Sequence, residues 1–108
     1  MKRGDLVTVA LQGAFGKPRP ALVIQSDLFE ATETLTVLPL SSAVVDAPHL
    51  RVPVRPSAGN GLRAPSHVMV DKTVTLLRSK VGPAFGRLEA EPLLEVERRL
   101  ALFLGIAK

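Results

Sequence analysis

The hydrophobic pattern changes its period once along this chain, and that change limits the fold more than any other feature. In the first three quarters of the sequence, apolar residues form short runs or alternate with other residues, as in β-strands. Near the C-terminus they recur at steps of three and four, at Leu93, Val96, Leu100, Phe103 and Leu104. This spacing defines one apolar stripe on a helix. Several strands followed by one terminal helix predict a mainly β (α+β) fold, a twisted antiparallel sheet or partial barrel with a helix packed on it.

Glycine, proline and β-branched residues set the expected boundaries of these elements. The predicted strands cover residues 5–11, 21–25, 35–40, 50–54 and 66–77. Loops or linkers are expected at 12–18, 41–48, 56–65 and 79–87, where turn-forming residues gather. Pro39 predicts an edge or a bulge, because proline cannot donate to a strand ladder. Pro92 suits the first turn of the helix and Gly105 its C-terminal cap.

Length and composition exclude several classes of protein. The 108 residues fit a single domain, residues 1–108, and a hydrophobic fraction of 46% excludes disorder. Without cysteine there is no disulfide, thiol nucleophile or cysteine-bound metal. His49 and His67 are too few and too scattered for a zinc site, so no metal or other cofactor is expected. The N-terminus lacks the apolar stretch of a signal peptide or membrane span, which favours a cytoplasmic protein without a membrane partner.

The charge of the chain suits an anionic partner. The net charge is +4 and the pI is about 10.1, a modest basic excess that does not identify the anion. The chain has four phenylalanines and neither tyrosine nor tryptophan. Proteins that grip single strands by stacking bases usually carry more aromatic rings. Any contact with RNA is therefore expected to depend on charge, backbone and shape.

The clearest candidate for an anion-binding group is Arg19, which stands between Pro18 and Pro20 at the start of an apolar strand. Proline fixes its own φ angle and restricts the residue before it to extended conformations. The backbone on both sides of Arg19 is therefore stiff. A guanidinium presented in this way suits bidentate binding of a phosphate, because its planar fork keeps its charge at any relevant pH.

Six short motifs follow one another over almost the whole chain. They are Arg3–Val7, Gly16–Pro20, Leu38–Ser42, Gly61–Ser66, Val70–Lys72 and Gly86–Leu88. Their order and spacing resemble those of the MazF/PemK (Kid-like) toxins of bacterial toxin–antitoxin systems. The resemblance implies an SH3-like β-barrel with a C-terminal helix that forms a homodimer. It also implies a cytoplasmic endoribonuclease that is neutralised by a cognate antitoxin with an acidic C-terminal segment.

The same resemblance suggests catalytic residues. The family's catalytic arginine falls on Arg19, and the position of its catalytic threonine is Ser41, which keeps the hydroxyl and loses a methyl group. Ser42 is the alternative source of this hydroxyl. Kid-like members also use an arginine where this chain has Met69, so the arrangement of one arginine and one hydroxyl is favoured.

The chemistry expected of this pair is metal-independent, sequence-specific cleavage of single-stranded RNA. The 2′-hydroxyl attacks the adjacent phosphorus, which leaves 2′,3′-cyclic phosphate and 5′-hydroxyl ends. Arg19 stabilises the phosphorane and Ser41 orients the 2′-hydroxyl or the phosphate. A serine of ordinary acidity is a poor base.

Other residues are assigned to binding or to structure. Contacts with RNA are expected from Gln12, Phe15, Lys17, Ser42, Arg78 and Lys80. Asp71 is interpreted as a buried structural carboxylate that accepts hydrogen bonds from the backbone, and Gly61 as a requirement of backbone geometry. His67 is interpreted as a residue of the strand surface or of an interface.

Two other functions remain open at this stage. One is a gyrase-poisoning toxin of the CcdB type, which shares the fold, although the tryptophan expected at the position of Leu104 is missing. The other is a non-catalytic SH3-like binding module. Grooves that bind proline-rich ligands are lined with aromatic residues, which are scarce here.

Overall fold

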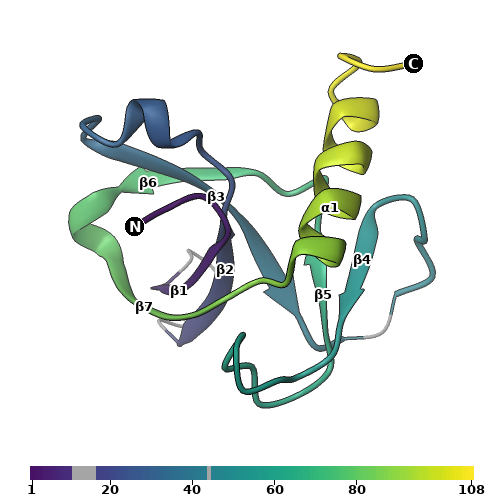
Figure 1. The fold of residues 1–108 in the computed structure, drawn as a ribbon, viewed down its shortest axis with the longest axis horizontal. Helices are drawn as coiled ribbons and strands as arrows, with labels where there is room; N and C mark the ends of the chain where they lie inside the picture. Colours follow the sequence, from purple (N-terminus) through teal and green to yellow (C-terminus); the bar gives the residue numbers. More distant parts are fainter. Residues whose placement is uncertain (11–16, 44) are drawn as a thin grey trace.

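The computed structural model describes residues 1–10, 17–43 and 45–108 (Figure 1). The described residues form antiparallel strands, two short 3₁₀ turns and one α-helix. The strands are β1 (Asp5–Ala10), β2 (Pro18–Val23), β3 (Thr34–Ser41), β4 (Arg51–Val54), β5 (Ser66–Met69), β6 (Val74–Leu77) and β7 (Val81–Arg87). The turns are η1 (Asp27–Phe29) and η2 (Arg78–Lys80), and the helix is α1 (Ala90–Phe103).

The strands form one sheet in the order β4-β5-β3-β2-β1-β7, with β6 also paired to β3. The long strand β3 therefore has two partners along one edge, β6 beside Thr34–Val37 and β5 beside Leu40 and Ser41. Pro39 lies between these two segments and is paired only with Ala21 of β2. Although β3 is central, Pro39 is locally at an edge. Its missing N–H therefore leaves no gap in the ladder.

The strand predicted over residues 66–77 is wrong as one continuous element. It is interrupted at Val70–Thr73, where the Lys72 N–H bonds to the Met69 carbonyl at 3.2 Å. The two halves become β5 and β6, and both pair with β3. The even-numbered positions from 68 to 76 are apolar except at Lys72, so the pattern alone does not reveal the break.

The linker predicted over residues 79–87 is also wrong. Most of it is β7, which pairs with β1, and its glycines are needed for packing instead of flexibility. A Cβ on Gly86 would lie 2.1 Å from the carbonyl oxygen of Asn60. Only a residue without a side chain permits this close approach between β7 and the loop after β4.

Apolar residues pack on both faces of the sheet. The helix face, which is the one that α1 covers, carries Leu6, Leu22, Leu38, Leu40, Val52, Val54, Leu62, Val68, Val70, Leu88 and Val96. The opposite face, here called the outer face, carries Val7, Val9, Ala21, Val23, Leu35 and Val37. Val74, Leu76 and Val81 from β6 and β7 cover this second cluster. The twisted antiparallel sheet with a C-terminal helix is thus confirmed.

The helix stands beside β4 and β5 at one side of the sheet (Figure 1). Val96 is fully buried, and Leu93 and Leu100 pack partly buried against the helix-face cluster. Phe103 and Leu104, the last residues of the predicted stripe, are about half exposed. Over the described part of the chain, no helix has the length and hydrophobicity needed to cross a membrane.

Candidate functional site

Arg19 lies near the start of β2, so the Pro-Arg-Pro segment is itself part of the strand. Arg19 pairs with Val9 of β1, which pairs on its other side with Val81 of β7. Side chains that lie directly opposite each other in an antiparallel pair point to the same face. Strand alternation therefore assigns the Arg19 side chain to the outer face, with Val9 and Ala21. Arg19 is exposed, and within the described residues it has no hydrogen bond or ion pair.

Ser41 ends β3 on the same face. Pro39 is paired with Ala21, and Ser41 follows Pro39 by two residues, as Arg19 precedes Ala21 by two. Continuing this register places Arg19 and Ser41 level with each other on neighbouring strands, just beyond the last paired residues. The Ser41 Oγ accepts a hydrogen bond from the Ala43 N–H at 3.1 Å, which holds the hydroxyl at the strand end.

Ser42 points to the other side of the sheet. It lines a cavity of about 640 Å³ together with Leu40, two residues earlier. The other residues of this cavity are Thr8, Pro18, Arg19, Pro20, Gly61, Leu62, Arg63, Ala64, Ser66 and Phe85. Arg19 itself also lines this cavity, between Pro18 and Pro20. Strand alternation assigns its side chain to the face of Ser41. The two adjacent serines lie on opposite faces.

The structure brings two of the predicted RNA contacts near Arg19. Lys17 is exposed and directly precedes β2. Lys80 is exposed and directly precedes Val81, which is two strands away from Arg19 in the ladder β7-β1-β2. The backbone of both residues is therefore close to the part of the sheet that carries Arg19. Gln12 and Phe15 lie outside the described residues.

Arg78 has a different environment. Its Nε donates to the carbonyl of Thr32, and its Nη2 donates to the carbonyl of Phe29 at 3.0 Å. The guanidinium thereby fixes the loop around η1 to the end of β6. Leu77 pairs with Thr34, so this site lies at the end of β3 opposite to Ser41.

Asp71 and Gly61 both have structural surroundings. The Asp71 carboxylate forms an ion pair with the Arg51 guanidinium, with 18% and 13% of the two side chains exposed, instead of the predicted backbone hydrogen bonds. Gly61 has a φ of +70°, and a Cβ there would lie 2.8 Å from the Phe85 carbonyl oxygen. Both its conformation and its packing require glycine.

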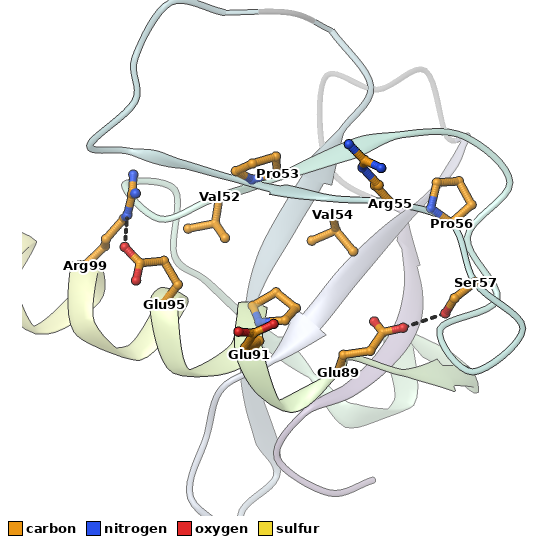
Figure 2. A pocket seen from close by; sticks show the side chains of 11 residues that line it. Val52, Pro53, Val54, Arg55, Pro56, Ser57, Glu89, Glu91, Glu95 and Arg99 are labelled. Atoms are coloured by element: carbon orange, nitrogen blue, oxygen red, sulfur yellow. Dashed lines mark hydrogen bonds and ion pairs between the residues drawn. The ribbon is translucent and has the colours of Figure 1, made fainter.

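His67 is the neighbour of Ser41 across the β3–β5 ladder, and it faces Pro53 across the β5–β4 ladder. Figure 2 shows Val52 and Val54 directed toward α1 and Pro53 directed away from it. His67 therefore also belongs to the outer face. Its Nδ1 is buried and has no hydrogen-bond partner among the described residues. An unsatisfied buried group of this kind costs about 1–3 kcal/mol.

A second cavity, of about 680 Å³, lies between β4 and the first turns of α1 (Figure 2). Its acidic wall consists of Glu89, Glu91 and Glu95, and Glu95 is bound to Arg99 at 2.7 Å. The Glu89 carboxylate accepts a hydrogen bond from the Ser57 hydroxyl at 2.5 Å. This bond ties the start of α1 to the loop that follows β4.

Asn60 organises the same loop and escaped the sequence interpretation. It is fully buried, and its Nδ2 donates to the Arg55 carbonyl at 2.8 Å and to Glu89 at 3.1 Å. Its Oδ1 accepts from the backbone N–H groups of Ser57 and Leu62, both at 3.0 Å. Asn60 thus shapes the segment that carries Gly61 and Leu62 into the wall of the first cavity. An asparagine in a Gly/Pro-rich segment is an ordinary turn signal, so nothing local distinguishes it.

The hydrogen bonds of the Glu89 carboxylate predict that the stability of the fold depends on pH in the acidic range. The hydrogen bond from Ser57, together with bonds from the backbone and Asn60, lowers the pKa of the Glu89 carboxyl below its ordinary 4.5. The unfolded chain therefore binds this proton more readily than the folded protein. The resulting stabilisation is present above pH 4.5 and is lost as the pH falls through the lowered folded pKa.

Urea unfolding of wild type and of Glu89→Gln at several pH values measures this effect as a difference in the free energy of unfolding. The variant should be less stable than wild type at neutral pH, and this difference should shrink as the pH falls below 4.5. Glu91→Gln is the matched control, because Glu91 has no hydrogen bond or ion pair to the described residues. A difference for Glu89→Gln that stays constant with pH would contradict the assignment.

The described residues contain no group of three or more His, Asp or Glu side chains that could hold a metal ion. Residues 2–104 match the profile of a protein family described as the PemK-like, MazF-like toxin of type II toxin–antitoxin systems. A protein of Mycolicibacterium smegmatis described as a probable endoribonuclease MazF is 44% identical over 108 residues, which cover 99% of each chain.

Solved structures of related proteins have the same fold. The Mycobacterium tuberculosis toxin MazF-mt6 superposes with a TM-score of 0.81 at 25% identity, over 96% of this chain and 99% of that one. A MazE-MazF structure from Deinococcus radiodurans (Form-II) gives a TM-score of 0.79 at 26% identity, over 99% and 97% of the two chains.

Proposed function

The chain belongs to the family of PemK-like, MazF-like toxins of type II toxin–antitoxin systems, and on this premise we propose that residues 1–108 form one toxin domain with endoribonuclease activity. The domain cleaves single-stranded RNA at specific sequences and needs no metal ion. The similarity to the mycobacterial probable endoribonuclease over nearly the full length of both chains supports this activity.

In the proposed reaction, the ribose 2′-hydroxyl attacks the adjacent phosphorus and releases the 5′-oxygen of the next nucleotide. Arg19 binds the phosphate and stabilises the charge that develops on the phosphorane, because its fork of N–H donors matches two phosphate oxygens. Ser41 orients the 2′-hydroxyl. The observation that supports this proposal is the pairing of Ala21 with Pro39, because extending this register by two residues would set Arg19 and Ser41 on one face and at one level.

The proposed RNA path runs over the end of the sheet where Arg19 lies. Lys17 and Lys80 are exposed there and can hold flanking phosphates. Gln12 and Phe15 are proposed to select bases, and Ser42 to contact RNA from the cavity on the helix face. Arg78 is left out of this path, because its guanidinium already binds the carbonyls of Phe29 and Thr32.

The proposed partners follow from the family and from charge. A cognate antitoxin with an acidic C-terminal segment would be attracted to a chain with a net charge of +4. One chain of a solved structure described as an endoribonuclease in complex with its cognate antitoxin, from a mycobacterial species, has the same fold as this chain, with a TM-score of 0.80. We also propose that two copies of this chain form a homodimer and that the protein acts in the cytoplasm.

The test is incubation of the purified protein with a defined pool of single-stranded RNA in the presence of EDTA. We expect cuts at a short recurring sequence, with 2′,3′-cyclic phosphate and 5′-hydroxyl ends. An oligonucleotide with one 2′-deoxyribose at the cut position should resist, because it lacks the attacking group. Intact RNA together with inhibition of purified gyrase would instead favour the CcdB-type function.

A further inference from the structure

The proposed cleavage leaves one step without a residue, namely acceptance of the proton from the attacking 2′-hydroxyl. Arginine stays protonated at any relevant pH, and serine has a hydroxyl that is a poor base. Imidazole is the side chain that ordinarily accepts a proton near neutral pH. On the outer face, next to Ser41, the described residues offer one imidazole, that of His67.

We propose that His67 Nδ1 is the proton acceptor for the Ser41 hydroxyl, and that this pair activates the 2′-hydroxyl of the RNA. The inference rests on the proposed ribonuclease function. His67 acts through Ser41 and is therefore a positioning residue, while Ser41 touches the substrate. No contact between His67 and RNA is required.

The strand ladder places the two side chains within reach of each other. Ser41 and His67 are directly opposite in the β3–β5 pair. Cβ atoms of such a pair lie about 4.5–5.5 Å apart, a gap that a serine Oγ and an imidazole Nδ1 together can span. The χ2 torsion of histidine is broad, so the ring can turn Nδ1 toward the hydroxyl without backbone movement.

Each of the two side chains also has a hydrogen-bonding group that is not used by another described residue. Nδ1 of His67 is buried and unpartnered, the only buried side-chain N or O atom of the described residues in that state. Ser41 Oγ accepts one hydrogen bond, from the Ala43 N–H, and its proton has no acceptor in the described part of the chain. The two groups thus belong to side chains that are directly opposite in the ladder, and the structure shows no hydrogen bond between them. A buried ring nitrogen without a partner calls for one in a native protein, and rotation of the ring about χ2 would supply the Ser41 hydroxyl.

The charged side chains around His67 come from β2, from β4 and from the turn after β5. Arg19 of β2 is assigned to the same face, level with Ser41, and binds the phosphate in the proposed reaction. Arg51 of β4 pairs with Met69 and so belongs to the outer face, and its guanidinium binds the Asp71 carboxylate of the turn after β5. Lys72 also approaches the Asp71 carboxylate, at 3.9 Å. Because the carboxylate is occupied in this way, it does not compete with Ser41 for the imidazole. Arg55 points to the same side as Pro53 (Figure 2) and lies two residues beyond it.

The step balances in atoms and charge. As the O2′–P bond forms, the O2′–H proton passes to Ser41 Oγ while the Ser41 proton passes to Nδ1. The P–O5′ bond breaks, and O5′ takes a proton from water. The imidazolium then returns its proton to solvent. Ser41 is regenerated as the neutral hydroxyl, and Arg19 remains protonated throughout.

The test is a double-mutant cycle with single-turnover and steady-state cleavage of an optimal RNA. His67→Ala should lower kcat about 100-fold with KM changed little, the scale of a lost general base. Ser41→Ala should have a similar effect, and the double variant should lie within about twofold of Ser41→Ala alone. His67→Asn, which keeps a hydrogen-bonding group without basicity, should stay as slow as His67→Ala.

Three outcomes would overturn the inference while wild-type cleavage upholds the ribonuclease function. They are an unchanged kcat in His67→Ala, effects of the two substitutions that multiply, and recovery of the wild-type rate in His67→Asn. If wild type itself cleaves no RNA, the proposed function fails instead.

A measurement on the intact histidine guards against variants that do not fold. His49 and His67 are the two histidines of the chain, and His49 is exposed. In ¹⁵N-histidine NMR, Ser41→Ala should move the Nδ1 signal of His67 and leave that of His49 in place. Two unmoved signals would overturn the proposed pair.

Discussion

Replacement of Arg19 by alanine is expected to reduce RNA cleavage by at least about 100-fold in kcat/KM, the scale on which loss of one donor to a transition-state oxyanion reduces catalysis. The guanidinium is exposed and has no hydrogen bond or ion pair with the described residues, so its loss should not unfold the protein. Arg19→Lys should recover part of the activity, because an ammonium supplies charge without the bidentate fork.

The matched control is Arg98→Ala, which removes the same charge from α1. Arg98 is 67% exposed and its distance to Glu95 is 3.7 Å, a surface pair of little energetic value. Its cleavage rate should equal that of wild type. Single-turnover assays on the same RNA, with circular dichroism to verify folding, make the comparison. A folded Arg19→Ala protein that cleaves at the wild-type rate would exclude Arg19 from the reaction.

The second large effect is expected at Gly86, where alanine should destabilise the protein by about 3 kcal/mol or more, at the upper end of the range for overpacking. The added Cβ would lie 2.1 Å from the Asn60 carbonyl oxygen and 2.4 Å from its carbonyl carbon, both backbone atoms. Asn60 is held by hydrogen bonds to Arg55, Ser57, Leu62 and Glu89 and cannot move aside. Relief therefore requires separation of β7 from that loop.

Gly59→Ala is the control for this substitution. Its Cβ would have its nearest neighbour, the Ser57 Oγ, at 3.9 Å, an ordinary van der Waals contact. Its stability should stay within about 0.5 kcal/mol of wild type. Urea unfolding of the three proteins measures both effects. Equal stabilities for Gly86→Ala and Gly59→Ala would show that β7 and the loop do not pack as described.

Local patterns were sufficient for most of the fold. Alternation and turn residues identified β1, the second half of β2 and most of β3 and β4. The helical stripe identified α1 through Leu93, Val96 and Leu100. They failed where one local pattern is compatible with two structures. In residues 66–77 the apolar positions resume in the same alternation after Lys72, so the turn at Asp71 is not evident. The glycines of β7 resemble linker residues until the atoms that they approach are known.

The amino-acid sequence by itself determined the strand-rich fold, the terminal helix and the rigid Pro18-Arg19-Pro20 segment, because propensity and periodicity depend on neighbours along the chain. The tertiary structure decided which residues meet. The ladders of β2, β3 and β5 assign Ser41 to the side of Arg19 and Ser42 to the other, and they set His67 across from Ser41. Strand register depends on pairing between distant segments, and a shift of one residue would exchange the two faces.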